Sequence, residues 1–349
     1  MSNLNFIADN KYFQDTSLYK EFRKHPIGFI DVGAAGGIHS LILPIASLTN
    51  CLCFEPNEAA FEGVRYETKK SCFSNLIVYN TAICDTDGES EFYITKSEVN
   101  SSLLKADPEF VKRYSVSGFD IFKNQIVKVQ TLDNVVHNIT KLYPNSAEII
   151  KLDCQGAEYN ILKGASDILT EQCVALWCEV EFFQVYENQK LFSDIDQLLR
   201  AKGFCLYGLY PNYISTKQLD RTRYETEERL MWADALYLKD PLPPANRHIN
   251  FSQRSVSVLI TSALLFNFFD LSLEIINTYI KNEEDKLNLI SLVKELSSSR
   301  KQMIEKDAND FMSKCANKMD NMFLYAKKFI DHNRGNNNIN FIKIDDRQK

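Results

Sequence analysis

The chain has 349 residues, enough for one large domain with an appendage or for two domains. Hydrophobic residues make up 45% of it and charged residues 25%, which is average for a soluble globular protein. The formal net charge of −6 gives no reason to expect binding to nucleic acid or to an anionic membrane.

The cysteines and the apolar runs indicate a cytoplasmic protein without a membrane span. Nine cysteines are scattered without a Cys-x-x-Cys pair, and we expect them to be reduced, as in a cytoplasmic protein. Cys51 and Cys53 point to one face of a strand, but they lack partners at metal-ligand spacing, so we expect no metal. Residues 1–10 lack the apolar core of a signal peptide. The longest apolar run, 256–269, is shorter than the roughly 20 residues of a membrane span.

The chain starts with a helical segment and then reaches its glycine-rich turn. Residues 9–25, within an N-terminal segment 1–27, form an amphipathic helix pattern. Four of the 12 glycines fall between Gly28 and Gly37, after a strand pattern at 28–32 and before a helix pattern at 38–46. A glycine turn between strand and helix lets a ligand approach the backbone and the free N–H groups of the helix start.

The sequence of this turn helps to identify its ligand. A dinucleotide fingerprint would need glycines at 33, 35 and 38, whereas Ala35 and Ile38 occupy two of these positions. The next strand, 51–55, ends in an acidic residue, Glu55, at 22 residues after Gly33. At that spacing a carboxylate can accept both hydroxyl protons of a ribose, while Asn57 caps the following helix over 58–70.

The remaining elements predict an α/β fold. Further strands are expected at 76–83, 149–153, 174–180, 203–209 and 233–238, with helices between most of them, including 156–169 and 192–202. This alternation indicates a parallel sheet with helices on both faces, and the last two strands form a hairpin-like edge. An insert over 89–135, with strand, loop and strand, is expected to pack over the ligand pocket.

Prolines at 241, 243 and 244 mark a domain boundary. Helices are expected near 253–268, 270–281 and 284–330, within a helical region 245–332, and a flexible tail follows at 333–349. The apolar residues of 256–269 cannot all face water, so this region is expected to pack against the core or to form a homodimer.

Four motifs together resemble a known family. Asp-x-Gly-x-x-Gly-Gly at 31–37 resembles motif I of the class I S-adenosylmethionine (SAM) methyltransferases. Together with Glu-Pro-Asn at 55–57 and the stretches 79–88 and 149–165, it resembles the FkbM methyltransferase family over residues 28–240. The resemblance implies a Rossmann-like sheet, mostly parallel with an antiparallel edge strand, and a C-terminal helical appendage. The chain departs from the family at Gln155, where a glutamate is usual.

The resemblance also implies a cofactor and an activity. The cofactor is SAM, and the expected reaction is O-methylation of a hydroxyl on a sugar or another small metabolite. The residues assigned to cofactor binding are Asp31, Gly33, Ala34, Gly36, Gly37, Glu55, Pro56, Ala82 and Ile83. Asp31 is expected near the ammonium group of the cofactor.

The candidate residues for the methyl acceptor are chosen by their chemistry and by their position at the ends of strands. A hydroxyl acceptor needs a base, and ligands of open α/β sheets bind at the carboxyl ends of the strands. Asp153, Glu179 and Glu181 end two predicted strands and are the catalytic candidates, although Asp153 could equally cap a helix. Asn100, Ser101 and Ser102 resemble a polar stretch of the family and are the candidates for acceptor binding.

Two other functions remain open. An NAD-dependent oxidoreductase is disfavoured by Ala35 and Ile38. A non-catalytic binding or assembly protein could keep the fold and use the helical region 245–332 as its interaction surface, and the Gln155 departure leaves this reading open.

Overall fold

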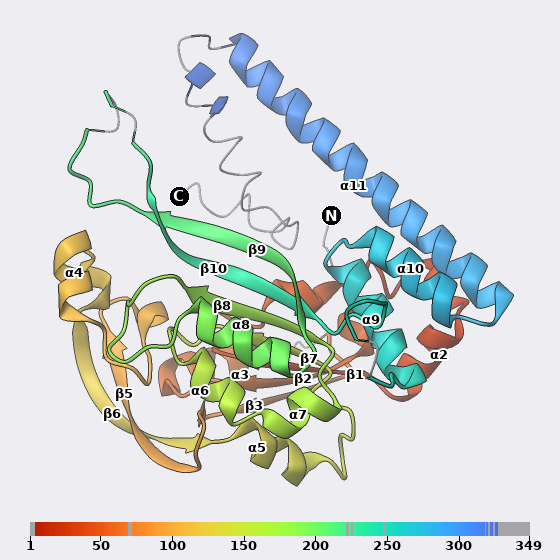
Figure 1. Cartoon of the computed structure of the whole chain (residues 1–349), viewed down its shortest axis with the longest axis horizontal. Helices are drawn as coiled ribbons and strands as arrows, with labels where there is room; N and C mark the ends of the chain where they lie inside the picture. The colour runs from red at the N-terminus through yellow and green to blue at the C-terminus, as the bar shows by residue number, and fades with distance from the viewer. Residues whose placement is uncertain are drawn as a thin grey trace. The chain divides into compact units, whose positions relative to one another are not determined.

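The computed structural model describes residues 4–68, 72–220, 223–224, 226–246, 249–317, 319, 322–323 and 325–326. The chain divides into two compact units (Figure 1). Residues 25–39 and 47–251 form one, the sheet unit, and residues 1–24, 40–46 and 252–349 form the other, the helical unit.

A seven-stranded sheet is the centre of the sheet unit. Its strand order is β3-β2-β1-β7-β8-β10-β9. The strands are β1 Ile27–Val32, β2 Thr49–Phe54, β3 Asn75–Tyr79, β7 Ile149–Leu152, β8 Ala175–Glu181, β9 Cys205–Ile214 and β10 Arg229–Leu238. The first five are parallel, and β10 is antiparallel to both β8 and β9. The predicted mostly parallel sheet is confirmed, and its reversed strand lies one position inside the edge.

The two faces of the sheet differ in polarity because side chains alternate along each strand. One face packs its apolar residues, such as Ile30, Leu52 and Ile150, against helices and forms the core. These helices are α5 Leu132–Ile139, α6 Glu158–Lys163, α7 Ser166–Glu171 and α8 Phe192–Ala201. The other face carries the polar side chains of the candidate site. The predicted helix 156–169 is two helices, α6 and α7, with Gly164 between them.

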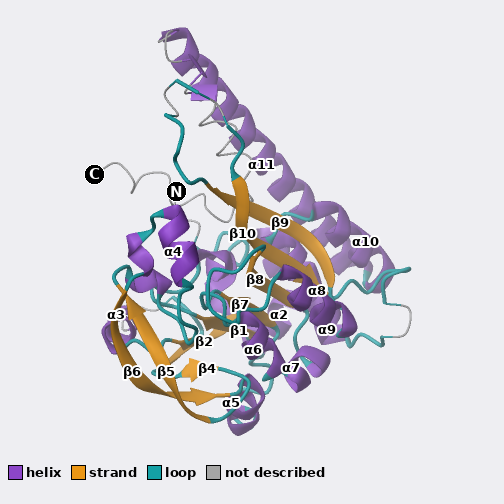
Figure 2. Cartoon of the chain, turned by 60° about the vertical axis from the view of Figure 1, so that its left-hand side comes forward, coloured by secondary structure: helices purple, strands orange, loops and turns teal. Residues whose placement is uncertain are grey.

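The insert is richer in structure than predicted (Figure 2). β5 Gly88–Thr95 and β6 Ile121–Gln130 join β4 Ala82–Ile83 in a second sheet, so the predicted strand 76–83 splits between two sheets. Between β5 and β6 lie η2 Glu98–Asn100, α4 Pro108–Tyr114 and η3 Ser117–Phe119. The prediction missed α4, although its start is marked: Asp107 accepts hydrogen bonds from the amides of residues 109 and 110, and Pro108 takes the first helical position.

The expected α-helix after the glycine turn does not form. The segment η1, Ser40–Leu48, is a 3-10 helix with Pro44 inside it, and Ile45 has a non-helical φ of −129°. Proline lacks an amide hydrogen and disfavours a helical conformation before it, so the i→i−4 ladder cannot run through this segment. The expectation of an α-helix N-terminus beside the turn was therefore wrong. α3, Glu58–Thr68, follows β2 as predicted.

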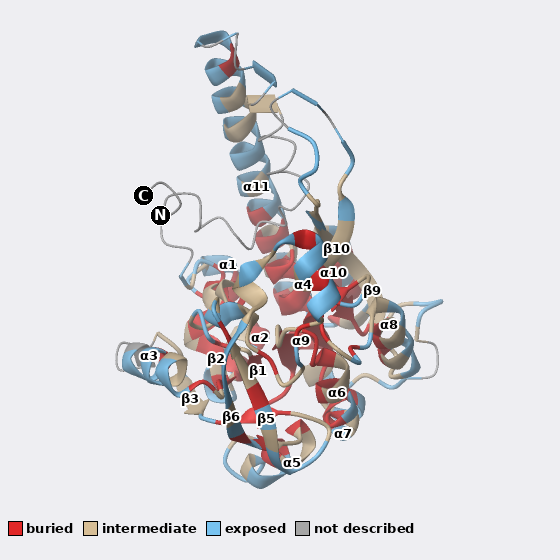
Figure 3. Cartoon of the chain, turned by 90° about the vertical axis from the view of Figure 1, so that its left-hand side faces the viewer, coloured by how far each residue is buried: buried red, intermediate tan, exposed pale blue. Residues whose placement is uncertain are grey.

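The helical unit contains α1 Lys11–Gln14, α2 Ser17–Lys24, α9 Gln253–Leu265, α10 Phe269–Tyr279 and α11 Glu283–Asn317. The predicted helix 9–25 is interrupted at Thr16, whose hydroxyl bonds to the carbonyl of Phe13. Residues 256–265 of α9 are buried within the single chain (Figure 3), so their apolar character no longer requires a second subunit. Among the described residues, no helix combines the length and apolarity that a bilayer span requires. The tail 333–349 lies outside the described residues.

Candidate active site

The glycine turn lies at the carboxyl ends of β1 and β2. The amides of Gly33 and Ala34 donate to the carbonyl of Phe54, and the amide of Gly37 donates to Ala34 O. Gly33 has φ +84°, and a Cβ there would overlap the carbonyl of Asp153, so only glycine fits. At Gly36, in contrast, a Cβ would meet no atom within 4 Å. The turn is therefore closed towards the sheet and open at its tip.

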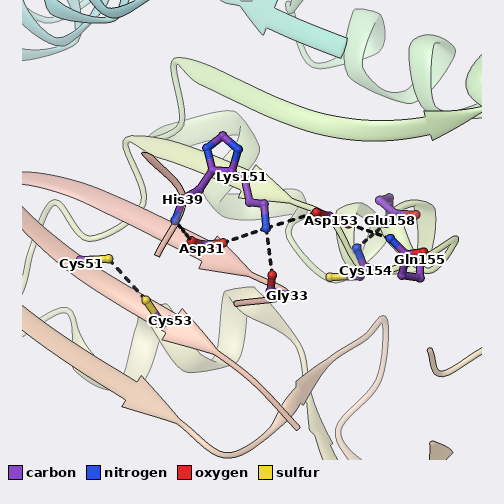
Figure 4. A network of polar contacts seen from close by, with 10 residues as sticks. All are labelled: Asp31, Gly33, His39, Cys51, Cys53, Lys151, Asp153, Cys154, Gln155 and Glu158. Atoms are coloured by element: carbon purple, nitrogen blue, oxygen red, sulfur yellow. Dashed lines mark hydrogen bonds and ion pairs between the residues drawn. The ribbon is translucent and has the colours of Figure 1, made fainter. Parts of the chain in front are cut away.

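Lys151 contacts the glycine turn through its ammonium group (Figure 4). Its ammonium lies 3.1 Å from Asp31 Oδ1, donates to the carbonyl of Gly33 at 2.9 Å, and lies 3.7 Å from Asp153 Oδ2. Burial alone would lower the pKa of Lys151, but the carboxylates of Asp31 and Asp153 outweigh this and raise it above its usual value. One buried cation therefore connects β1, the turn and the end of β7.

Asp31 is enclosed by this arrangement. Its side chain is fully buried, and its second oxygen accepts a hydrogen bond from the amide of His39 at 2.8 Å. Asp31 is thus directed to Lys151 and to the far end of the turn, and not to the open tip where a ligand would lie. Near it, Cys51 and Cys53 point to the same sheet face with sulfur atoms 3.5 Å apart, and both are free thiols.

Glu55 lies at the end of β2 and is almost fully buried. Its Oε1 accepts a hydrogen bond from the amide of Asn57 at 2.7 Å, while Asn57 accepts from the amides of Ala59 and Ala60 and so caps α3. Burial raises the pKa of Glu55 to about 7, although Lys151 and the Asn57 amide act in the other direction. Three other residues were predicted to bind the cofactor. The carbonyl of Pro56 accepts a hydrogen bond from the side-chain amide of Asn80, and Ala82 and Ile83 are buried in β4.

Gln155 connects Asp153, which follows β7, with Glu179 of β8. Its Nε2 donates to Asp153 Oδ1 and to Glu179 Oε2, both at 2.9 Å, and its Oε1 accepts from the Tyr186 hydroxyl at 3.0 Å. These contacts use both amide hydrogens, so the amide orientation is determined. Asp153 remains the accessible member of the group, with a side chain 43% exposed. A glutamate at 155 could not donate to either carboxylate unless it was protonated.

Several buried carboxyl groups lie near Asp153 and Gln155. Burial raises the pKa of Glu179 and of Glu181 well above the usual range, and neighbouring carboxylates add to the shift. Burial also raises the pKa of Glu158 and of Asp234 to about 7. Such groups hold protons near neutral pH and can donate hydrogen bonds.

The structure also shows residues that the sequence analysis missed. Asp234 pairs with Glu179 across the β8–β10 ladder, and a lone acid in an apolar strand was the available signal. Glu158, not Asp153, accepts the backbone hydrogen bond of the turn before α6, from the amide of Cys154 at 2.6 Å. Among the described residues, no group of three or more His, Cys, Asp or Glu side chains is arranged to hold a metal ion.

The insert reaches this site through its backbone and hydroxyl groups. Ser102 donates to the carbonyl of Gln155 at 2.8 Å and accepts from the amide of Leu104. Ser101 accepts from the amide of Thr95, and the carbonyl of Asn100 accepts from Tyr186. The structure thus brings residues 100–102 beside Gln155, where both serine hydroxyls bond within the protein.

An aromatic row lies on the same sheet face. The rings of His39 and Trp177 have centroids 6.2 Å apart, and Trp177 stacks on Tyr210 at 5.2 Å. Trp177 also hydrogen-bonds to Asp234, which limits the upward shift of the pKa of that carboxyl group. The site therefore combines an open turn and a row of carboxyl groups, and the buried Trp177 stacks on Tyr210 beside them.

Comparisons with known proteins identify a family. The model of the methyltransferase FkbM domain family matches residues 31–206, just over half of the chain. A search of the curated proteins found no match. Several solved structures are similar to the chain, among them the following three. The methyltransferase FkbM from Methylobacillus flagellatus KT is 16% identical with a TM-score of 0.35, and the match covers 61% of this chain but only 43% of that one.

Two further structures match a larger share of the chain at lower identity. A putative tRNA methyltransferase from Streptococcus pneumoniae is 10% identical, with a TM-score of 0.29 and coverage of 80% of this chain and 98% of that one. TrmK from M. capricolum, in complex with S-adenosyl-homocysteine, is 11% identical, with a TM-score of 0.27 and coverage of 81% and 95%. By the match over residues 31–206, the chain belongs to the methyltransferase FkbM domain family.

Proposed function

We propose that the protein is a SAM-dependent methyltransferase that methylates a hydroxyl group of a sugar or of another small metabolite. The observation that carries this proposal is the direct contact between the two halves of the site. The backbone of Asp153 lies against Gly33 of the open turn, while its side chain is the accessible carboxylate of the acceptor side. Family membership supports the methyl-transfer class.

The residues present fit SAM. The tip of the turn offers backbone and open space at Gly36, and Glu55 presents a carboxyl group at the end of the neighbouring strand. We propose that residues 33–37 and Glu55 hold the cofactor, with Pro56, Ala82 and Ile83 near it. Asp31 then acts as a positioning residue through His39 and Lys151. SAM supplies an activated methyl group when bound.

The chain's own residues provide for a hydroxyl acceptor. A hydroxyl group must lose its proton as it is methylated, and Asp153 is the accessible proton acceptor of the site. Gln155 and Lys151 fix the position of Asp153 through hydrogen bonds and charge. Glu179 and Glu181, protonated near neutral pH, can donate hydrogen bonds to the hydroxyl groups of a polyol.

Two measurements test the proposal. Calorimetry should detect binding of SAM and not of NAD, which separates a methyltransferase from an oxidoreductase. Release of S-adenosylhomocysteine should then be screened against a panel of sugars, nucleotide sugars and polyols. With an active acceptor, Asp153→Asn should keep SAM binding and lose roughly a hundredfold in turnover. Unchanged turnover would transfer the role to Glu179 or Glu181, and SAM binding without transfer to any acceptor would favour a non-catalytic protein.

We also propose a cytoplasmic location, which the nine free cysteines support. The homodimer stays a prediction. It was predicted because the apolar run 256–269 needs to be covered, and this argument is weaker because residues 256–265 are buried within one chain. Light scattering on the full-length protein at micromolar concentration distinguishes monomer from dimer.

A further inference from the structure

The helical unit contains a cavity of its own, of about 320 Å³. Four separate stretches of chain line it: the N-terminal residues, the 40–44 segment, the end of α9 and the middle of α11. Its floor includes Leu41, Leu264 and Leu265, whose side chains are otherwise buried. The volume lies at the lower end of the range of small-molecule sites, about 300–1,000 Å³.

The lining segments are held in place by backbone hydrogen bonds. The amide of Asn5 donates to Leu43 O at 2.8 Å, and the amides of Ile7 and Ala8 donate to Pro44 O at 3.1 Å. These bonds join the N-terminal stretch to the 40–44 segment on one side of the cavity. The site is therefore pre-formed by backbone contacts within the helical unit.

The lining of the cavity also includes polar side chains. Asn10 donates through Nδ2 to Glu295 Oε1 at 2.9 Å, so one oxygen of this lining carboxylate is bonded to a neutral amide of the protein. Arg300 is the one cation among the described lining residues, and the hydroxyl groups of Ser40 and Ser299 lie in the same lining. A guanidinium group is a planar fork that suits a carboxylate better than a neutral head group.

We propose that this cavity binds a small amphipathic carboxylate, with its apolar body on the leucine floor and its head group at Arg300. The body gains by leaving water against Leu41, Leu264 and Leu265, and the head gains a charge-assisted hydrogen bond. This site consists of residues of the helical unit alone and is independent of methyl transfer.

Sodium octanoate is the probe, titrated into the full-length protein by calorimetry without SAM. We expect saturable 1:1 binding, and at least tenfold weaker binding of 1-octanol, which has the same body without the charge. Arg300→Gln should weaken octanoate binding about tenfold, as expected for loss of a hydrogen bond to a charged group. Lys301→Gln is the matched control, because it removes the same charge from the next residue, which does not line the cavity.

A second pair of variants tests the position of the apolar body. Met303 lines the cavity and is partly exposed, so Met303→Trp should fill the space without unfolding the helix and weaken octanoate binding at least fivefold. Met312→Trp makes the same change on an exposed part of α11 and should leave the affinity within twofold. No saturable octanoate binding, equal affinity for 1-octanol, or unchanged affinity in both Arg300→Gln and Met303→Trp would overturn the proposal. SAM binding is measured separately, so either proposal can fail alone.

Discussion

Lys151 offers the sharpest test of how the site is held together. Its ammonium is 4% exposed and lies 3.1 Å from the fully buried carboxylate of Asp31. At an effective dielectric constant of 20, two charges at that distance attract with about 5 kcal/mol. Removing one member of a buried pair leaves the other uncompensated, which typically costs about 3–5 kcal/mol. Lys151→Met, similar in shape but uncharged, should therefore lower the free energy of unfolding of the sheet unit by about 3–5 kcal/mol.

The assay can report on the sheet unit alone. The two tryptophans of the chain, Trp177 in β8 and Trp232 in β10, both belong to it. Urea unfolding followed by tryptophan fluorescence therefore measures the unit that contains Lys151. Lys163→Met is the matched control, because Lys163 forms an exposed ion pair with Asp85, and such a pair contributes at most about 1 kcal/mol.

A double variant separates charge from packing. Lys151→Met combined with Asp31→Asn removes both charges, so it should recover at least half of the stability lost in Lys151→Met alone. If the double variant is as unstable as the sum of the single variants, the loss comes from packing, and the argument for a buried ion pair is refuted. A Lys151→Met protein as stable as the Lys163→Met control would refute it as well.

Three further predictions concern the carboxyl groups. Glu55→Ala should weaken SAM binding by roughly 2–4 kcal/mol in calorimetry, with Glu58→Ala on the exposed start of α3 as control, and equal affinities would sink the ribose assignment. Since burial raises the pKa of Glu55 to about 7, and its ionised form accepts the ribose hydroxyl protons, SAM should bind about tenfold more tightly at pH 8 than at pH 6. A flat profile between these values would contradict it. Burial raises the pKa of Glu158 to about 7 in the folded state, above its unfolded value, so the folded state holds an extra proton between about pH 4.5 and 7. The stability that Glu158 contributes is present in acid and lost as pH rises through 7, and Glu158→Gln should remove up to about 3 kcal/mol of this dependence in the fluorescence assay. Glu62→Gln is the control and should leave the pH dependence of stability unchanged. If Glu158→Gln also retains the full pH dependence, this dependence belongs to other groups.

Local features of the sequence determined much of the fold. The glycine turn, the alternation of strands and helices, and the Asn57 cap depend on neighbours within a few residues, and each could be predicted from the chain alone. The same holds for the family, because its motifs are short runs in a set order. The strand pattern also showed that Cys51 and Cys53 share one face.

Other features were missed or wrong because distant residues decide them. Gly164 divides a predicted helix where the chain passes close to Cys84, whereas the break at Pro44 in the helix expected after the turn was a local signal that the prediction overlooked. The strand expected over 76–83 divides because its second half pairs with β6, more than 40 residues away. Local periodicity does not contain such information.

The chemistry of the site depended on tertiary structure most of all. The sequence alone determined that carboxylates end β1, β2, β7 and β8, but not which of them would be covered. Sheet register places Lys151 beside Asp31, 120 residues earlier, and so turns Asp31 inward while Asp153 stays accessible. Gln155 has a left-handed backbone conformation, and its side-chain amide donates hydrogen bonds to Asp153, after β7, and to Glu179, in β8. Burial and charge at a given atom depend on all surrounding atoms, so only the folded chain determines which carboxyl group carries a proton and which can accept one.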